Sequence, residues 1–189
     1  MALFCLMLSA CEKDAARMTV EETRGETTKD HPPKLFATSD ERFRNAKPSP
    51  VKGKPPKNWL VLPGKEFREL NYRFGDSGLG EVYVSITGGS VADNVNRWLG
   101  QFNMNPLSPA AMDVLPKVPL AGTEGVWLEA SGEYASGMGA PAKAGQALAG
   151  VIAEVGGRIL TLKMVGPEAE VGAEKEALKA FAASLELVE

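Results

Sequence analysis

The sequence predicts an α+β domain, an antiparallel β-sheet with helices packed against it, over residues 58–189. Segments that alternate apolar and polar residues recur through this region and are separated by glycine-containing turns. Two further segments carry apolar residues at helical spacing, one after the second strand and one after the fifth. These 132 residues are enough to bury about two-thirds of their unfolded surface, so we expect a stable core without a disulfide.

The first two strands are predicted at residues 67–74 and 81–87. In the first strand Leu70, Tyr72 and Phe74 share one face, and the second strand alternates strictly between apolar and polar residues. An Asp-Ser-Gly turn separates the two strands, which predicts an antiparallel hairpin or meander.

A helix is predicted from Ser90, which can accept a hydrogen bond at its N-terminus, to about Phe102. Its buried face consists of Val91, Val95, Trp98, Leu99 and Phe102. Residues 103–119 contain four prolines and are predicted to form a loop, with a short helical turn around residues 110–114.

Three more strands are predicted, at residues 125–134, 147–155 and 158–165. The pair Gly156-Gly157 is typical of a tight hairpin turn between the last two of them. The final helix, about residues 168–185, has an inner face of Val171, Leu178, Phe181, Ala182 and Leu185.

The amino-terminal part divides into a short apolar leader, residues 1–11, and a charged, proline-rich segment, residues 12–57. The second segment shows no regular periodicity and has few large apolar residues, so we expect a disordered tether. The leader is much shorter than the roughly 20 residues that cross a bilayer, and it fits the apolar region of an export signal.

The run Leu8-Ser9-Ala10-Cys11 resembles the lipobox of bacterial lipoprotein signal peptides. That resemblance implies cleavage before Cys11, diacylation of its sulfur and acylation of the new amino terminus, so that Cys11 attaches the protein to a lipid membrane. Glu12 at the next position implies the periplasmic side of the outer membrane. The alternative is that Cys11 is a plain thiol. No Lys or Arg precedes the apolar run, so we expect a trimmed or misplaced start.

Charge divides unevenly between the tether and the domain. Residues 12–57 carry eleven Lys or Arg against eight Asp or Glu, whereas residues 58–189 carry ten against sixteen. The basic stretch 34–57 could rest on anionic lipid head groups or could serve only as a solvated linker. A domain with a net charge of −6 repels nucleic acid, which argues against nucleic-acid binding.

The predicted domain contains no cysteine and no histidine. Cys5 and Cys11 lie in the leader region and His31, the only histidine, lies in the tether. This excludes a metal site built from His and Cys in the domain, and we expect no cofactor. A nucleophile would have to pair with Lys or a carboxylate, and no catalytic set is recognisable, so we expect no enzyme activity.

Candidate binding residues lie on the first predicted helix. Asn94, Arg97 and Gln101 stack one turn apart as a polar stripe, with Asn96 beside it. Amides and a guanidinium supply directed donors for an anion or a backbone, but the same residues could instead pin the helix to a neighbouring loop. Trp59 and Trp127 are candidate surface aromatics, and the alternative for Trp127 is packing beneath a helix.

The run Asn94-Val95-Asn96-Arg97-Trp98-Leu99-Gly100-Gln101, together with the Gly-Val-Trp-Leu-Glu strand from Gly125 and the strand 160–167, resembles an uncharacterised family of bacterial lipoproteins. This family is similar in fold to the Mog1/PsbP-like α/β/α sandwich, whose members act as non-catalytic partners of other proteins. The resemblance implies a cell-envelope lipoprotein with a domain that binds an envelope protein. The alternative is a small-ligand carrier with a groove near the Asn94, Arg97 and Gln101 stripe.

Overall fold

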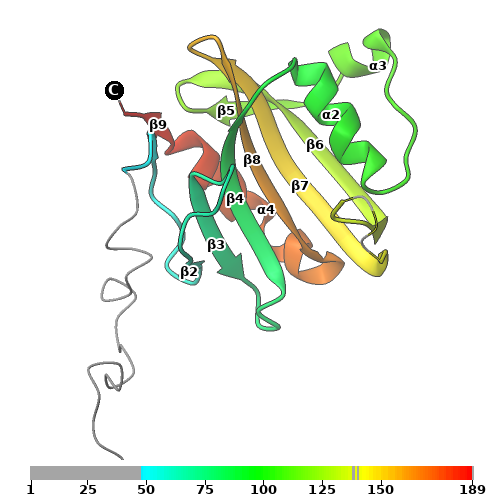
Figure 1. The fold of residues 1–189 in the computed structure, drawn as a ribbon, viewed down its shortest axis with the longest axis horizontal. Helices are drawn as coiled ribbons and strands as arrows, with labels where there is room; N and C mark the ends of the chain where they lie inside the picture. Colours follow the sequence, from blue (N-terminus) through cyan, green and yellow to red (C-terminus); the bar gives the residue numbers. More distant parts are fainter. Residues whose placement is uncertain (1–47, 138, 140, 189) are drawn as a thin grey trace, which may run out of the picture. The chain divides into compact units, whose positions relative to one another are not determined.

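The computed structural model describes residues 48–137, 139 and 141–188, and Figure 1 shows their arrangement. The predicted leader, Cys11 and the predicted tether as far as residue 47 lie outside the described residues. Within the described part of the chain, no helix combines the length and the apolar character needed to span a bilayer.

Seven strands form one antiparallel sheet in the order β2-β3-β4-β8-β7-β6-β5, and β1 pairs with β9 in a separate antiparallel ribbon. The strands are β1 Val51–Lys52, β2 Leu60–Val61, β3 Leu70–Phe74, β4 Gly80–Thr87, β5 Lys117–Leu120, β6 Thr123–Tyr134, β7 Lys143–Val155, β8 Arg158–Pro167 and β9 Glu186–Leu187.

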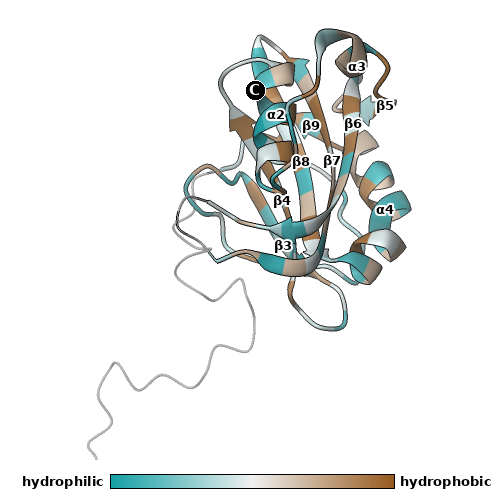
Figure 2. Cartoon of the chain, turned by 90° about the vertical axis from the view of Figure 1, so that its right-hand side faces the viewer, coloured by the Kyte–Doolittle hydropathy of each residue, from teal (hydrophilic) through white to brown (hydrophobic). Residues whose placement is uncertain are grey.

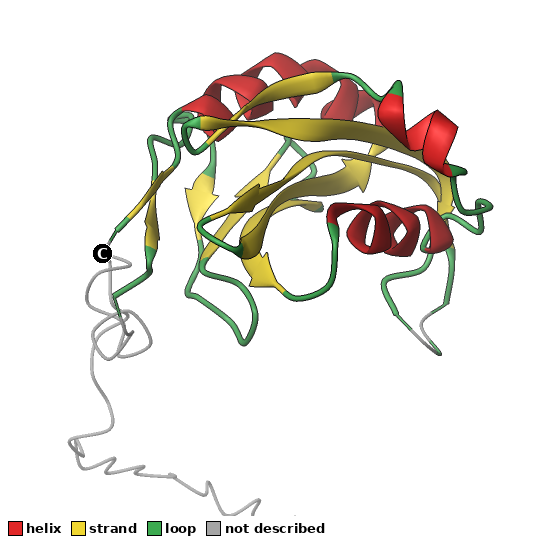
Figure 3. Cartoon of the chain, turned by 90° about the horizontal axis from the view of Figure 1, so that it is seen from above, coloured by secondary structure: helices red, strands yellow, loops and turns green. Residues whose placement is uncertain are grey.

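Helices lie on both faces of the sheet (Figure 3). They are α2 Val91–Gly100, the short α3 Pro109–Asp113 and α4 Glu168–Ala183. An antiparallel sheet between α2 on one side and α4 on the other is an α/β/α sandwich, so the α+β class predicted from the sequence is confirmed.

Each face of the sheet has its own apolar core. On the α4 face, the inward residues of α4 meet alternate residues of the strands, and all five residues predicted for its inner side are at most 1% exposed. Hydrophilic and hydrophobic segments alternate along α4 in Figure 2, as expected for a helix buried on one side. On the α2 face, Val95, Trp98 and Leu99 pack on Leu148 and Ile152. The central strands β7 and β8 are therefore buried on both faces.

The sequence signals for local structure are met at several elements. Ser90 caps α2 with a capping box, because its hydroxyl accepts from the Asp93 amide while the Asp93 carboxylate accepts from the Ser90 amide. Gly156 and Gly157, with φ of +58° and +73°, form the turn between β7 and β8. Strands β3 and β4 pair as predicted, with Leu70, Tyr72 and Phe74 facing the α4 core.

Four strands were not predicted, β1, β2, β5 and β9. Val51, assigned to the disordered tether, is 1% exposed and pairs with Leu187. The domain therefore begins before residue 58, because pairing with β9, far away in the sequence, holds this segment in place. Strand β5 was predicted as loop on account of its proline; Pro119 lies in an edge strand, where a missing amide donor is tolerated.

Gly150 lets α2 lie close to β7. A Cβ at Gly150 would stand 2.6 Å from the Trp98 ring and 2.7 Å from the Leu162 carbonyl oxygen, both far inside normal contact distances. The absence of a side chain at this position therefore allows the Trp98 ring to approach the backbone of β7.

Candidate functional site

The α2 face of the sheet is only partly covered. Helix α2 contacts β6 and β7, whereas β3 and β4 carry no helix on that face. The uncovered part is a groove with two lobes of about 520 Å³ and 400 Å³ that share Arg68 and Tyr83. The first lobe is also lined by Phe67 and Arg97, and the second by Arg73, Tyr134 and Lys143. We call this surface the sheet groove.

Strand alternation brings the polar floor of the sheet groove together. Val82 and Val84 of β4 point into the α4 core, so Glu81 and Tyr83 point to the opposite face. The register pairs Tyr83 with Lys163 of β8 and Arg73 of β3 with Glu81. Three neighbouring strands thus place ionisable side chains on the same side.

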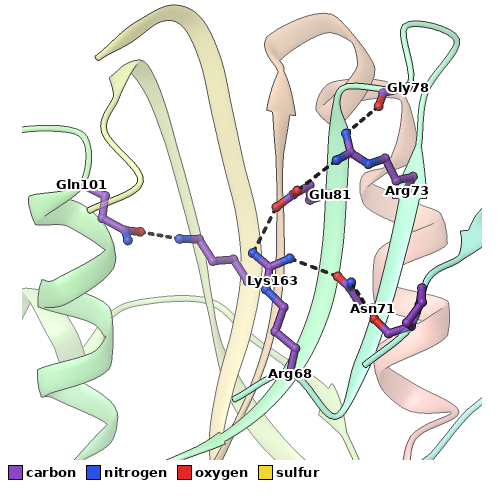
Figure 4. A network of polar contacts seen from close by, with 8 residues as sticks. Arg68, Asn71, Arg73, Gly78, Glu81, Gln101 and Lys163 are labelled. Carbon is purple, nitrogen blue, oxygen red and sulfur yellow. Dashed lines mark hydrogen bonds and ion pairs between the residues drawn. The ribbon is translucent and has the colours of Figure 1, made fainter. Parts of the chain in front are cut away.

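Arg68 lies at the centre of the sheet groove, immediately before β3. Its guanidinium carbon stands 4.0 Å from the centre of the Tyr83 ring, a cation–π arrangement. Its two terminal nitrogens donate to Asn71 Oδ1 at 3.0 Å and to Glu81 Oε2 at 3.1 Å (Figure 4). These contacts fix the plane of the guanidinium over the tyrosine ring.

Glu81 is shared between two arginines. Arg73 lies 3.5 Å from Glu81 Oε1 and donates to the Gly78 carbonyl at 2.8 Å (Figure 4). Across both lobes the lining includes four cations, Arg68, Arg73, Arg97 and Lys143, against two carboxylates, Glu66 and Glu81. The sheet groove is therefore positive on a domain whose net charge is negative.

Two cations near the groove are held by neutral amides. Arg97 donates to Asn94 Oδ1 at 2.5 Å, and Lys163 donates to Gln101 Oε1. Neither cation forms an ion pair with a carboxylate among the described residues. An amide oxygen orients a cation without neutralising it, so the positive charge of Arg97 stays available to a ligand.

Burial changes the pKa of three groups on this face and raises that of Tyr134. Burial raises the pKa of Tyr83. Tyr134 and Glu81 raise it further, whereas the cations Arg68 and Arg97 lower it. Burial lowers the pKa of Lys163 to about 7, because a buried amine loses its hydration and Arg97 and Arg68 add repulsion, with Glu81 acting in the opposite direction. Tyr83 is thus neutral at physiological pH, and Lys163 is close to its midpoint.

The polar side chains of the predicted stripe form hydrogen bonds within the domain. Asn94 is 2% exposed, donates to the carbonyls of Gly88 and Ser90, and accepts from Thr87 and Arg97. Asn96 accepts from the Leu107 amide and anchors the loop after α2. Gln101 holds Lys163. Of the stripe, only Arg97 lines the sheet groove, and the two amides beside it position cations.

The two tryptophans proposed as surface aromatics are buried on the α4 face. Trp127 packs in the α4 core, donates from Nε1 to Glu129, and has Lys179 5.2 Å from its ring. Its strand alternation points it away from the sheet groove, so it is separated from the stripe. Trp59 lies among Tyr72, Phe74 and Phe181, with ring centres 5.4 to 6.3 Å apart, and donates to Glu174.

Sequence reasoning missed Arg68, Arg73, Tyr83, Tyr134 and Lys163. A signal was present, since the outward face of residues 81–87 carries polar and aromatic side chains and Lys163 interrupts an apolar strand. Bringing these residues together requires the strand order, which joins β4 to β8 across 70 residues of sequence and is not readable from local pattern.

The side chains that line the sheet groove could bind an anion. Among the described residues, no three His, Cys, Asp or Glu side chains gather in a way that could hold a metal ion. The groove offers guanidinium donors and two tyrosine rings, which suit a carboxylate or another oxyanion beside an apolar group.

No family model and no curated protein sequence matches this chain. Similar solved structures include a protein from Bacteroides thetaiotaomicron (15% identity, TM-score 0.44) and LpqN of Mycobacterium tuberculosis, involved in cell envelope biogenesis (14%, 0.42). A third is cyanobacterial PsbP, CyanoP, from Synechocystis (13%, 0.45). Each match covers 74% of this chain, and 45%, 83% and 88% of the respective structures. The chain thus spans less than half of the Bacteroides protein.

Proposed function

We propose that this domain is a non-catalytic binding module of the bacterial cell envelope, and that its sheet groove docks an acidic segment of a partner protein. The observation that carries the proposal is the positive lining of the uncovered sheet face, where Arg97 is oriented by an amide and has no carboxylate partner in the part of the chain that the structure describes. A carboxylate-bearing segment supplies the missing charge, and arginines can bind it in a bidentate manner.

The rim of the sheet groove favours a protein as the partner. Phe67 is 76% exposed at the first lobe, and Leu79 is 65% exposed at the second. Phe67 also has φ of 64°, a left-handed conformation that costs about 1 kcal/mol for a residue with a Cβ. Residues 48–137, 139 and 141–188 leave most of the Phe67 side chain uncovered, so a partner could pack against it. Aromatic and arginine side chains together are typical of the central residues of protein interfaces.

The resemblance of the leader to a lipoprotein signal supports an envelope location. Acylation at Cys11 attaches the chain to the membrane, by default on the periplasmic side of the outer membrane, and the segment before β1 sets the reach of the domain. A module held in this way meets partners at the membrane surface, where a moderate affinity is enough because the local concentration is high.

Site-specific photo-crosslinking in intact cells tests the proposal. A p-benzoylphenylalanine at position 67 is expected to capture a defined partner, because this position borders the sheet groove. The matched control is position 114, where Val114 is 80% exposed but lies outside both lobes. The capture at position 67 should disappear in Arg97→Glu and persist in Lys117→Glu, a change of equal charge on β5 at the opposite edge of the sheet.

Three outcomes contradict a partner in the sheet groove. They are no capture at position 67, equal capture at positions 67 and 114, and capture at position 67 that survives Arg97→Glu. Mass spectrometry of the captured partner then checks that the crosslinked peptide is acidic.

A small-ligand carrier is the second candidate, and the shape of the first lobe favours it. Its volume of about 520 Å³ lies in the range of small-molecule sites, and Arg97, Tyr83 and Ser85 converge on it. Native mass spectrometry of the gently purified protein distinguishes this role. A co-purifying small molecule that is lost in Arg97→Gln supports a carrier, whereas a bare protein mass with positive photo-crosslinking supports the protein partner.

A further inference from the structure

Lys163 is a buried amine next to Tyr83 and Tyr134, two residues that line the sheet groove. It is 1% exposed and lies on β8 between Leu162 and Met164, which point into the opposite core. Its position opposite Tyr83 in the β4–β8 register places it on the same face as the groove. The ring of Tyr134, which lines the second lobe, has its centre 5.2 Å from the Lys163 nitrogen. One layer of aromatic side chains therefore separates this amine from the space where a ligand would lie.

The groups that surround Lys163 do not neutralise it. From α2 it meets the amide oxygen of Gln101 and the Trp98 ring, 5.4 Å from the amine nitrogen. From β4 and β6 it faces Tyr83 and Tyr134, while β7 contributes Leu148 and Gly150 on this face. The charged groups that act on it are Arg97 of α2, Arg68 before β3 and Glu81 of β4, two cations against one anion. Figure 4 shows Lys163 directed toward Gln101 on one side of the arginine–glutamate network.

This setting makes the charge of Lys163 depend on what occupies the groove. In the empty domain its pKa is lowered to about 7, so most molecules hold a neutral amine above neutral pH. A carboxylate in the groove would add an anion on the side where Arg68 and Arg97 now repel the proton. An opposite charge nearby favours the protonated amine, and the effect is strong when the intervening space is poorly solvated.

We infer that the sheet groove is a proton-coupled carboxylate site, in which protonation of Lys163 from solvent increases as a carboxylate of the ligand enters. The inference rests on the proposed function, since it concerns the same groove, and it adds that binding depends on pH. Thermodynamic linkage then requires the converse, that protonation of Lys163 strengthens binding by the same factor. If the carboxylate raises the pKa of Lys163 by about one, binding is about tenfold tighter well below neutral pH than well above it.

Among the described groups near the sheet groove with a shifted pKa, Lys163 titrates in the neutral range. Arginines stay charged throughout, and burial raises the pKa of Tyr83 and Tyr134 further above neutrality. Free acidic side chains ionise near pH 4, so an acidic peptide keeps its charge across the range of interest. A pH dependence centred between 7 and 8 therefore reports on Lys163.

The experiment uses an acetylated, amidated hexaglutamate peptide as the ligand and hexaglutamine as the uncharged control. Calorimetric titration of the full chain at pH 6.5 and 9.5 is expected to give about tenfold tighter binding at the lower pH. Titrations at pH 8 in two buffers of different ionisation enthalpy should show net uptake of about 0.4 proton per peptide for a rise in pKa from about 7 to about 8. Lys163→Met should bind with equal affinity at both pH values, whereas Lys117→Met, on β5 and outside both lobes, should keep the pH dependence.

A second measurement needs no change at Lys163. Carbon-13 labelled lysine in the wild-type chain allows the Lys163 side chain to be titrated by NMR, with and without hexaglutamate. A titration midpoint that rises on binding supports the inference, and a midpoint that stays the same overturns it.

The outcomes separate the two proposals. Binding of hexaglutamate with the same affinity at both pH values, or a pH dependence retained in Lys163→Met, overturns proton coupling and leaves the groove as a binding site. Absence of binding at either pH, or binding unaffected by Arg97→Gln, overturns the groove and the coupling together.

Discussion

A buried amine reduces stability by an amount that depends on pH. The pKa of Lys163 is about 7 in the folded domain, against about 10.4 for a solvated lysine in the unfolded chain. Between these values the unfolded chain binds more protons than the folded one, so stability rises as pH increases from 7 to 10.4. The penalty is full below pH 7, where both states are charged and only the folded one is desolvated, and it disappears above about pH 10.4.

Replacing this amine by an apolar side chain of similar length should stabilise the domain. Lys163→Met is expected to raise the free energy of unfolding by on the order of 4 kcal/mol at pH 6, with the gain falling toward zero near pH 10.5. The loss of one hydrogen bond to Gln101 offsets about 1 kcal/mol of that gain. Urea unfolding at pH 6, 8 and 10 measures the trend, with the exposed Lys143→Met as the control. A gain that is constant across pH, or a less stable variant at pH 6, would contradict the burial of a neutral amine.

At the scale of secondary structure, elements with local signals were predictable. The capping residue Ser90 fixed the start of α2, the glycine pair marked the β7–β8 turn, and period-two alternation identified β4. Each of these signals acts over a few residues, where backbone geometry and the nearest side chains decide the conformation. The position of Arg97 next to Asn94 was predictable for the same reason, because helical spacing alone places the two residues one turn apart.

Elements that are held in place by residues far away in the sequence were not predictable. Val51 lies in a segment rich in lysine and proline, and it becomes a strand because Leu187, at the other end of the domain, pairs with it. Lys163 is embedded in an apolar run, and only the sheet order shows that it faces Tyr83 and Gln101. The candidate site is built from such non-local pairings, which explains why sequence reasoning found its helix residue and missed its strand residues.

The β1–β9 ribbon should contribute measurably to stability. Val51 is buried against the end of α4, and Gly53 beside it approaches Leu185 so closely that a Cβ would stand 2.5 Å from the leucine side chain. Val51→Ala removes two buried methyl groups and is expected to lower the free energy of unfolding by about 2 kcal/mol. The neighbouring Lys52→Ala, whose side chain is exposed, should change it by less than about 0.5 kcal/mol. Equal effects in chemical unfolding would show that residues 51–52 do not belong to the cooperative domain.

At the scale of the whole domain, the charge of the groove is opposite to that of the molecule. Residues 58–189 carry sixteen acidic against ten basic side chains, yet the sheet groove collects four cations. An acidic partner would be repelled by the net charge of the domain and attracted at the sheet groove. This charge distribution contributes more to the orientation of the bound partner than to its affinity, because repulsion by like charges elsewhere disfavours other docking modes.

Binding at the sheet groove should therefore depend on salt and on where a charge is changed. Raising ionic strength from 50 to 500 mM is expected to weaken hexaglutamate binding by about tenfold at pH 6.5, because the screening length shrinks to a few ångströms. Lys143→Glu, at the second lobe, should weaken it several-fold at 50 mM. Lys117→Glu makes the same change in net charge on β5, at the other edge of the sheet, and should leave the affinity within about twofold. If both lysine substitutions weaken binding equally, peptide binding depends on the net charge of the domain. That outcome would contradict binding directed by the local charge of the sheet groove.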